Sequence, residues 1–132
     1  MKVIVDTSIW SLSLRRKKHR KETKSEKLMQ IIDDGRIVML GPIRQEVLSG
    51  IKNKNHFELL KKYLRPFPDL ALLPEDYELA AEFFNICRTR GVQGSNTDFL
   101  ICASAVNNNF NIYTSDKDFD LFNKHIPIQL EN

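Results

Sequence analysis

Five short apolar runs alternate along the chain with longer stretches in which apolar residues recur at helical spacing. The short runs predict strands at residues 2–5, 36–40, 70–73, 111–114 and 126–130. The longer stretches predict helices over 9–14 and 25–34, from Pro42 onward, over 57–64, from Pro74 to near Gly91, and from Asn96 or Thr97 through the run FLICASAV. This last run is apolar on more than one side, which is typical of a helix buried near the centre of a domain.

Short strands that alternate with helices favour a parallel sheet with helices on both faces. We therefore expect a three-layer α/β/α sandwich whose sheet is short, twisted, mostly parallel and built of about five strands. Pro127 places the last strand at an edge, because proline cannot donate a ladder hydrogen bond. The chain has 132 residues with no internal repeat or linker, so residues 1–132 are expected to form one domain. Ligands of such sheets bind outside the carboxyl ends of the strands.

The charge of the chain is unevenly distributed. The net charge of the chain is +3, from 20 Lys and Arg against 17 Asp and Glu. Residues 15–27 hold eight Lys or Arg and two Glu, which is a net charge of +6. The remaining residues of the chain therefore carry a net charge of −3. Such a basic run either attracts a phosphate polyanion or forms a solvated connection. The candidate contacts to a nucleic-acid backbone are Arg15, Arg16, Lys17, Lys18, Arg20 and Lys21.

Composition narrows the class of protein. The chain is 42% hydrophobic and 28% charged, as in soluble globular domains. No apolar run approaches the ~20 residues that a membrane span needs, and the N-terminus reaches Asp6 too soon for a signal-peptide core. Cys87 and Cys102 both lie in apolar helical patterns, and two thiols form no disulfide framework. We expect a reduced, cytoplasmic protein that has no membrane partner.

Four carboxylates fall near the carboxyl ends of the predicted strands or at the starts of helices: Asp6, Glu46, Asp98 and Asp116. Each alone has an ordinary structural explanation as a helix cap, a turn residue or a surface acid. Together, at one edge of a sheet, they would repel one another unless a cation lay among them. Carboxylate oxygens are ligands that Mg²⁺ and Mn²⁺ prefer, and the three histidines are scattered. The acids therefore predict a Mg²⁺ or Mn²⁺ site for phosphoryl chemistry.

Four segments resemble the PIN-domain ribonucleases, and specifically the VapC-type toxins of toxin–antitoxin pairs. They are VIVDTSIW at 3–10, GPIRQEVLSGI at 41–51, NTDFLICASAV at 96–106 and IYTSDKDF at 112–119. Each piece alone is weakly specific, but their order and spacing match the family over essentially the whole chain. The resemblance implies a PIN-like fold and a metal-dependent endoribonuclease that hydrolyses RNA phosphodiesters. It also implies a homodimer that is neutralised by a small cognate antitoxin.

The resemblance also implies roles for individual residues. Asp6, Glu46, Asp98 and Asp116 match the family's acidic set, and we expect Asp6 and Asp98 to hold the principal metal ion. Asp116 would complete the metal site directly or through water, and Glu46 would orient a water or hold a second ion. The supporting hydroxyls of the family's motifs match Ser8 and Thr114, while Asp118 or Asp120 can share or replace the role of Asp116.

Three alternatives come from other classes of protein. A phosphoacceptor receiver domain needs an acidic pair after the first strand, and a haloacid-dehalogenase-like phosphatase needs a second aspartate two residues after the first. Here Thr7 and Ser8 follow Asp6, so both patterns fail. The third alternative is a non-catalytic module that binds RNA or protein on a nuclease-like fold. Metal-dependent turnover of RNA separates this module from the enzyme.

Overall fold

A three-stranded parallel sheet forms the centre of the chain, and its strand order is β2-β1-β3. The strands are β1 (Val3–Val5), β2 (Ile37–Val38) and β3 (Asn111–Tyr113). Val3 is paired with Ile37 on one side and with Asn111 on the other. All three residues of β1 are fully buried, as expected for a central strand covered on both faces. This computed structural model describes residues 1–14 and 22–132.

The sheet is smaller than the five strands expected, because two of the apolar runs contribute only single bridges. Asp69 bridges Met39, and Leu130 bridges Ile112, both in parallel. Residues 70–73 form an extended connection in which Leu70 and Leu72 pack against the core while Ala71 and Leu73 are exposed. Residues 126–130 lie along the outer edge of β3, where Pro127 was expected to place them.

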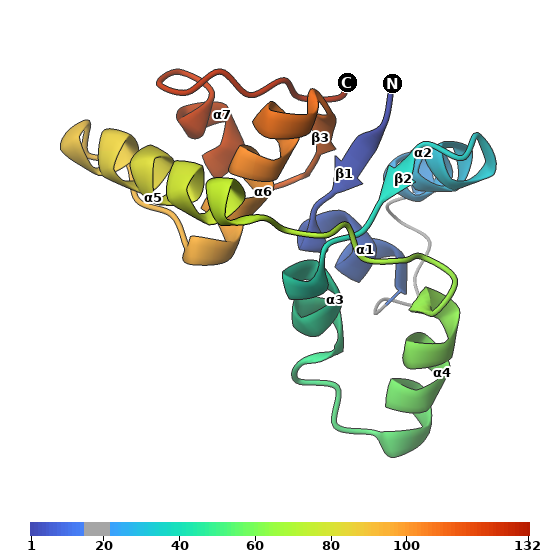
Figure 1. The fold of residues 1–132 in the computed structure, drawn as a ribbon. Coiled ribbons are helices and arrows are strands. Elements are labelled where there is room, and N and C mark those ends of the chain that lie inside the picture. Colours follow the sequence, from blue (N-terminus) through green and yellow to red (C-terminus); the bar gives the residue numbers. More distant parts are fainter. Residues whose placement is uncertain (15–21) are drawn as a thin grey trace.

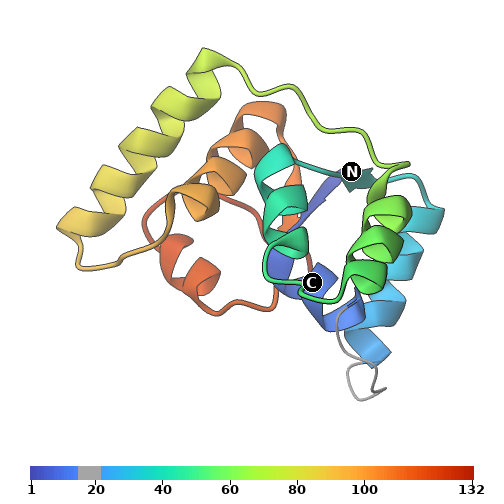
Figure 2. The same cartoon turned by 90° about the horizontal axis from the view of Figure 1, so that it is seen from below.

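Helices lie on both sides of the sheet, so the expected α/β sandwich is confirmed. In Figures 1 and 2, α5, α6 and α7 lie together on one side of β1, and α2 and α4 lie on the other. In Figure 1, α3 and α4 project beyond the carboxyl end of β1. The helices are α1 (Thr7–Leu14), α2 (Glu22–Asp33), α3 (Gly41–Leu48), α4 (Lys54–Leu64), α5 (Pro74–Thr89), α6 (Asn96–Asn108) and α7 (Asp118–Phe122).

Helix α6 is the central helix that its apolar sequence predicted. Its buried residues are Phe99, Ile101, Cys102, Ala103, Ser104 and Ala105. The cap differs from the expected Asn96 or Thr97, because the Ser95 side chain accepts a hydrogen bond from the backbone of Asp98. Helix α7 was not anticipated: it has only five residues, and it is held by the burial of Phe119 and Phe122 rather than by a long helical repeat.

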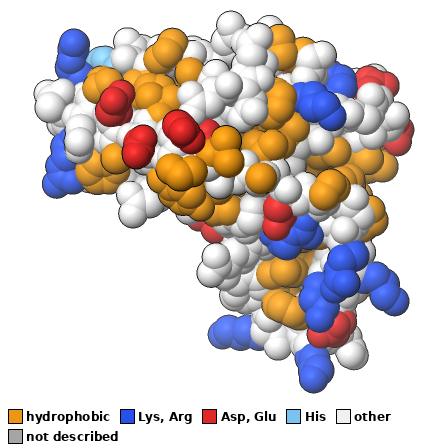
Figure 3. All heavy atoms as spheres, viewed as in Figure 1, with side chains coloured by type: hydrophobic (Ala, Val, Ile, Leu, Met, Phe, Trp, Pro, Cys, Tyr) orange, Lys and Arg blue, Asp and Glu red, His pale blue; other side chains and the backbone are white. Residues whose placement is uncertain are grey.

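Charged side chains gather over different helices. Figure 3 shows acidic side chains over α5 and basic ones at the lower end of the molecule, over α4. The sequence of α5 carries Glu75, Glu78 and Glu82, whereas α4 carries Lys61 and Lys62. Within the described residues, no helix is both long and apolar enough to cross a membrane.

Candidate functional site

Asp6 lies at the point where β1 ends and α1 begins, and its side chain faces the neighbouring strand end. Its backbone N–H donates to Tyr113 O at 2.9 Å, which continues the pairing of β1 with β3. The residue is only 5% exposed. Its Oδ2 accepts hydrogen bonds from Ser8 Oγ and from Thr114 Oγ1, both at 2.8 Å. Burial raises the pKa of Asp6, although these hydrogen bonds oppose the shift.

Ser8 and Thr114 tie the end of β1 to the segment that follows β3. Besides holding Asp6, Ser8 Oγ accepts from the backbone N–H of Ser115 at 3.1 Å. Thr114 Oγ1 likewise accepts from the backbone N–H of Asp116 at 2.9 Å. The two hydroxyls expected to support the site therefore contact Asp6 directly, and the same contacts fix the turn that carries Asp116.

Asp98 reaches the same edge of the sheet from the first turn of α6. A reciprocal capping box holds it: Ser95 N–H donates to Asp98 Oδ2 at 3.1 Å, and Asp98 N–H donates to Ser95 Oγ at 3.0 Å. Burial raises the pKa of Asp98, and the negative charges of Asp6 and Asp116 raise it further. The structure thus brings Asp6 and Asp116 close enough to Asp98 for their charges to act on it.

The three acids of the segment after β3 differ in their surroundings. Asp116 is half-buried, and its Oδ1 accepts from the backbone N–H of Asp118 at 2.9 Å. Asp118 and Asp120 are exposed in the first turn of α7. Because Asp116 is the member of this trio whose charge acts on Asp98, the geometry favours Asp116 as the site residue.

Glu46 approaches from α3, and its contact joins that helix to the end of β1. Its Oε1 accepts a hydrogen bond from Thr7 Oγ1 at 2.7 Å. Thr7 was not singled out in the sequence, although its place beside Asp6 in the Asp-Thr-Ser motif was a usable signal. Ser95 was also missed, and its spacing of three residues from Asp98 is the pattern of a capping box.

The donor set suits a hard divalent cation. Carboxylate oxygens are the preferred ligands of Mg²⁺ and Mn²⁺, and a cation would offset the repulsion that raises the pKa of Asp98. Among the described residues, however, no three His, Cys, Asp or Glu side chains form a complete coordination group. The carboxylates therefore lie near one another without converging on a single point. The candidate basic contacts at Arg15, Arg16, Lys17, Lys18, Arg20 and Lys21 lie outside the described residues.

A parallel three-stranded sheet is covered by helices on both sides, and Asp6, Asp98 and Asp116 lie at its carboxyl edge, so the fold and the site together define an α/β domain with an acidic site. The sequence model of the PIN domain family matches residues 3–124, and the chain belongs to this family. The expected family and PIN-like fold are thereby confirmed.

Proteins of known name and structure resemble the chain over nearly its full length. Ribonuclease VapC11 of Mycobacterium tuberculosis is 28% identical over 129 residues, which is 96% of each chain. VapC ribonuclease Mb1587 of Mycobacterium bovis shows the same identity and coverage.

Two solved structures share the fold at lower identity. One is VapBC2 from Rickettsia felis bound to a DNA fragment from its promoter, with a TM-score of 0.77, 18% identity, and 100% of this chain and 98% of that chain covered. The other is FitAcB from Neisseria gonorrhoeae, with a TM-score of 0.76, 17% identity, and coverage of 98% and 96%.

Proposed function

We propose that this chain is a divalent-metal-dependent endoribonuclease and the toxin of a VapBC-type toxin–antitoxin pair. The observation that carries the proposal is the grouping of Asp6, Asp98 and Asp116 at the carboxyl edge of the sheet. Burial raises the pKa of Asp6 and of Asp98, and the charges of Asp6 and Asp116 raise the pKa of Asp98 further. The ribonuclease names of the relatives support the same reaction class. The proposed substrate is RNA, and the bond that is hydrolysed is a phosphodiester.

Asp6 and Asp98 would hold the principal Mg²⁺ or Mn²⁺ ion, and Asp116 would complete or support the metal site directly or through water. When bound, such an ion neutralises phosphate charge and lowers the pKa of a coordinated water. Ser8 and Thr114 would keep Asp6 in one orientation by donating to its Oδ2. Held in this way, the carboxylate is positioned before substrate arrives, which is what phosphoryl chemistry requires of its residues.

Glu46 would orient the attacking water and accept its proton. The hydrogen bond from Thr7 occupies Oε1, so Oε2 is the oxygen that would take the proton. The water oxygen forms the new bond to phosphorus, the bond from phosphorus to a ribose oxygen breaks, and that leaving oxygen takes up a proton from solvent. No side-chain nucleophile takes part in this scheme.

The proposed partners follow from the structural neighbours. One neighbour is described as a VapBC complex bound to promoter DNA, and another as FitAB bound to a DNA fragment. We assign to this chain a small cognate antitoxin that covers the acidic site, and a homodimeric state. Cys87 and Cys102 are free and buried, as suits a protein of the reducing cytoplasm.

The test is cleavage of a mixed RNA pool with Mg²⁺ or Mn²⁺ and with EDTA, using wild type and Asp6→Asn. Asp34→Asn is the matched control, because it removes an exposed acid just before β2, at the opposite edge of the sheet. We expect metal-dependent products from wild type and Asp34→Asn, and none from Asp6→Asn. A parallel Asp118→Asn variant should cleave normally if Asp116 is the site acid.

Two outcomes would contradict the proposal. Cleavage by Asp6→Asn at the wild-type rate would remove Asp6 from the site. Folded wild-type protein that binds RNA yet yields no products with either metal would favour the non-catalytic binding module.

A further inference from the structure

A polar hollow of about 290 Å³ lies beside the acidic site. Its lining comes from the start of α2, from the turn after β3 and from the C-terminal segment, and it includes Lys24, Thr114, Asp116 and Lys117. Thr114 and Asp116 also belong to the acidic site, so the hollow and the site share a wall. The volume is close to the lower end of the range for small-ligand pockets, which suits a single phosphate-bearing unit.

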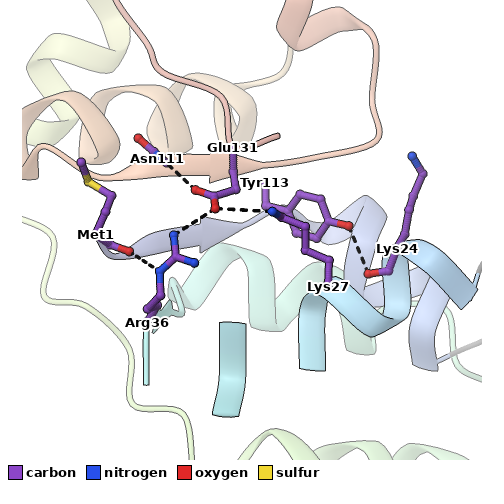
Figure 4. Close-up of polar contacts among 7 residues, drawn as sticks. All are labelled: Met1, Lys24, Lys27, Arg36, Asn111, Tyr113 and Glu131. Atoms are coloured by element: carbon purple, nitrogen blue, oxygen red, sulfur yellow. Dashed lines mark hydrogen bonds and ion pairs between the residues drawn. The ribbon is translucent and has the colours of Figure 1, made fainter. Parts of the chain in front are cut away.

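The start of α2 is fixed in place relative to β3. Tyr113 Oη donates to the backbone carbonyl of Lys24 at 3.1 Å, and Lys27 Nζ lies 5.9 Å from the centre of the Tyr113 ring. Figure 4 shows that the Lys24 side chain extends away from this carbonyl contact. The backbone of Lys24 therefore belongs to an anchored helical turn, from which its exposed side chain extends.

Glu131 lies on the other side of the hollow, and two neighbouring cations already balance its negative charge. Glu131 Oε2 lies 2.9 Å from Arg36 Nη2 and 3.6 Å from Lys27 Nζ, and Asn111 donates to its Oε1 at 2.8 Å (Figure 4). Burial by itself would raise the pKa of Glu131, but the hydrogen bonds from Asn111 and Arg36 and the nearby positive charges outweigh it, so the pKa is lowered. Glu131 remains ionised and fully matched by its own cations.

Lys24 and Lys117 differ from these cations, because neither forms an ion pair with any described residue. Both are exposed and open onto the hollow. Asp120 is the remaining acid of the lining outside the acidic site and the Glu131 cluster. Two unmatched ammonium groups beside a site for phosphoryl chemistry would attract the negative charge that accompanies a reacting phosphate.

We propose that this hollow is a phosphate subsite in which Lys24 and Lys117 hold a backbone phosphate of the RNA strand next to the phosphate that is cleaved. The subsite rests on the proposed function, since it takes the substrate to be RNA. Lysine contacts a phosphate as a mobile point charge and carries no information about the base. The subsite therefore supplies affinity and strand direction, not sequence preference.

The experiment compares the Lys24→Ala/Lys117→Ala double variant with a Lys52→Ala/Lys54→Ala control. The control removes two exposed lysines, one from the connection between α3 and α4 and one from the first residue of α4. Binding of a fluorescent single-stranded oligoribonucleotide is measured by anisotropy at several salt concentrations, with Asp6→Asn added to every protein so that the RNA stays intact. Cleavage kinetics are measured separately with Asp6 restored.

We expect the Lys24/Lys117 variant to bind RNA about tenfold more weakly and to lose about 0.7–1.4 from the slope of log affinity against log salt, which corresponds to one or two phosphates. In cleavage, KM should rise while kcat stays near the wild-type value. The control should keep affinity, slope and KM.

Three results would overturn the subsite. One is an unchanged salt slope in the Lys24/Lys117 variant; another is an equal loss in the control, which would indicate diffuse charge attraction. The third is unchanged RNA binding with weakened binding of an acidic peptide of the same charge, which would assign the hollow to a protein partner. The cleavage assay tests the proposed function separately. If wild type cleaves RNA and Asp6→Asn does not, the proposed function is supported even when the subsite is ruled out.

Discussion

Replacing Gly94 by alanine tests how closely the loop before α6 is packed, and therefore how Asp98 is held. A Cβ atom at residue 94 would lie 2.6 Å from Phe122 Cζ and 3.0 Å from Phe99 Cε2. Both rings are at most 1% exposed, and their centroids are 4.8 Å apart. Neither ring can move aside without disturbing the core, so the loop itself must shift.

The size of the effect follows from this contact. Overpacking a core lowers the free energy of unfolding by about 1–3 kcal/mol. A contact this short with two buried rings belongs in the upper part of that range, about 2–3 kcal/mol. The smaller entropy of an unfolded chain with alanine offsets about 0.4–1 kcal/mol. The net loss is about 1–2.5 kcal/mol. An unfolding entropy of about 2.1 cal/mol/K per residue over 132 residues converts this to a fall in Tm of about 4–9 °C.

Thermal unfolding in EDTA, followed by circular dichroism, measures the change. Gly41→Ala is the matched control, since its added Cβ would meet only Asp69 Oδ2 at an ordinary 3.6 Å. Because Ser95 follows Gly94 directly, a shifted loop also displaces the cap that holds Asp98. Gly94→Ala should therefore cleave RNA more slowly than wild type even at temperatures below the Tm of the variant. An unchanged Tm in Gly94→Ala, or an equal fall in Gly41→Ala, would refute the reasoning.

Three further predictions concern the acids. The pKa of Asp6 and of Asp98 is higher in the folded protein than in the unfolded chain, where it is about 3.9. The two protonated carboxyl groups therefore contribute fully to the free energy of unfolding below the unfolded-state pKa, and this contribution is lost as the pH rises through the folded-state pKa. In EDTA, the unfolding free energy of Asp6→Asn minus that of wild type should therefore grow between pH 4 and pH 7 in urea titrations; a difference that is flat with pH would contradict this. Mg²⁺ or Mn²⁺ at a hundredfold excess over its Kd should stabilise wild type by about 2.7 kcal/mol in thermal shift and Asp6→Asn much less; equal stabilisation would place the ion elsewhere. Thr7→Val should lower kcat about tenfold with KM unchanged, because Glu46 loses its hydrogen bond; Thr7→Ser should restore kcat, and failure of that rescue would rule out a positioning role.

The elements that sequence reasoning located well are those with local signals at their ends. Pro74 begins α5 where it was expected, and the continuous apolar run of α6 proved to be the central helix. Residues 70–73 were wrongly assigned as a strand, because an apolar run of four cannot distinguish a strand from an extended connection. Only packing decides that question: of the backbone N–H groups from Leu70 to Leu73, only that of Leu70 bonds to a neighbouring strand position, at Met39 O.

Asp6, Asp98 and Asp116 could be found because each lies next to a strand end or in a first helical turn, which is a local property of the chain. The contacts that hold them are not local. Thr7 and Glu46 are 39 residues apart, and Thr114 lies 108 residues from Asp6. Such pairs depend on how β1, β3 and α3 come together, so sequence spacing alone could not reveal the Thr7–Glu46 contact.

The way in which charge is balanced links the fold to the proposed chemistry. The ion pairs among the described residues stabilise Glu131, Asp69 and Glu58, while Asp6 and Asp98 are held instead by hydroxyl and backbone N–H donors. Uncharged donors orient a carboxylate without cancelling its charge, so the acids keep their affinity for a cation from solution. A lysine or arginine placed among them would stabilise the fold and compete with that cation. Lys24 and Lys117, which form no ion pair with any described residue, line the neighbouring hollow, where a positive charge can hold phosphate without occupying the place of the metal.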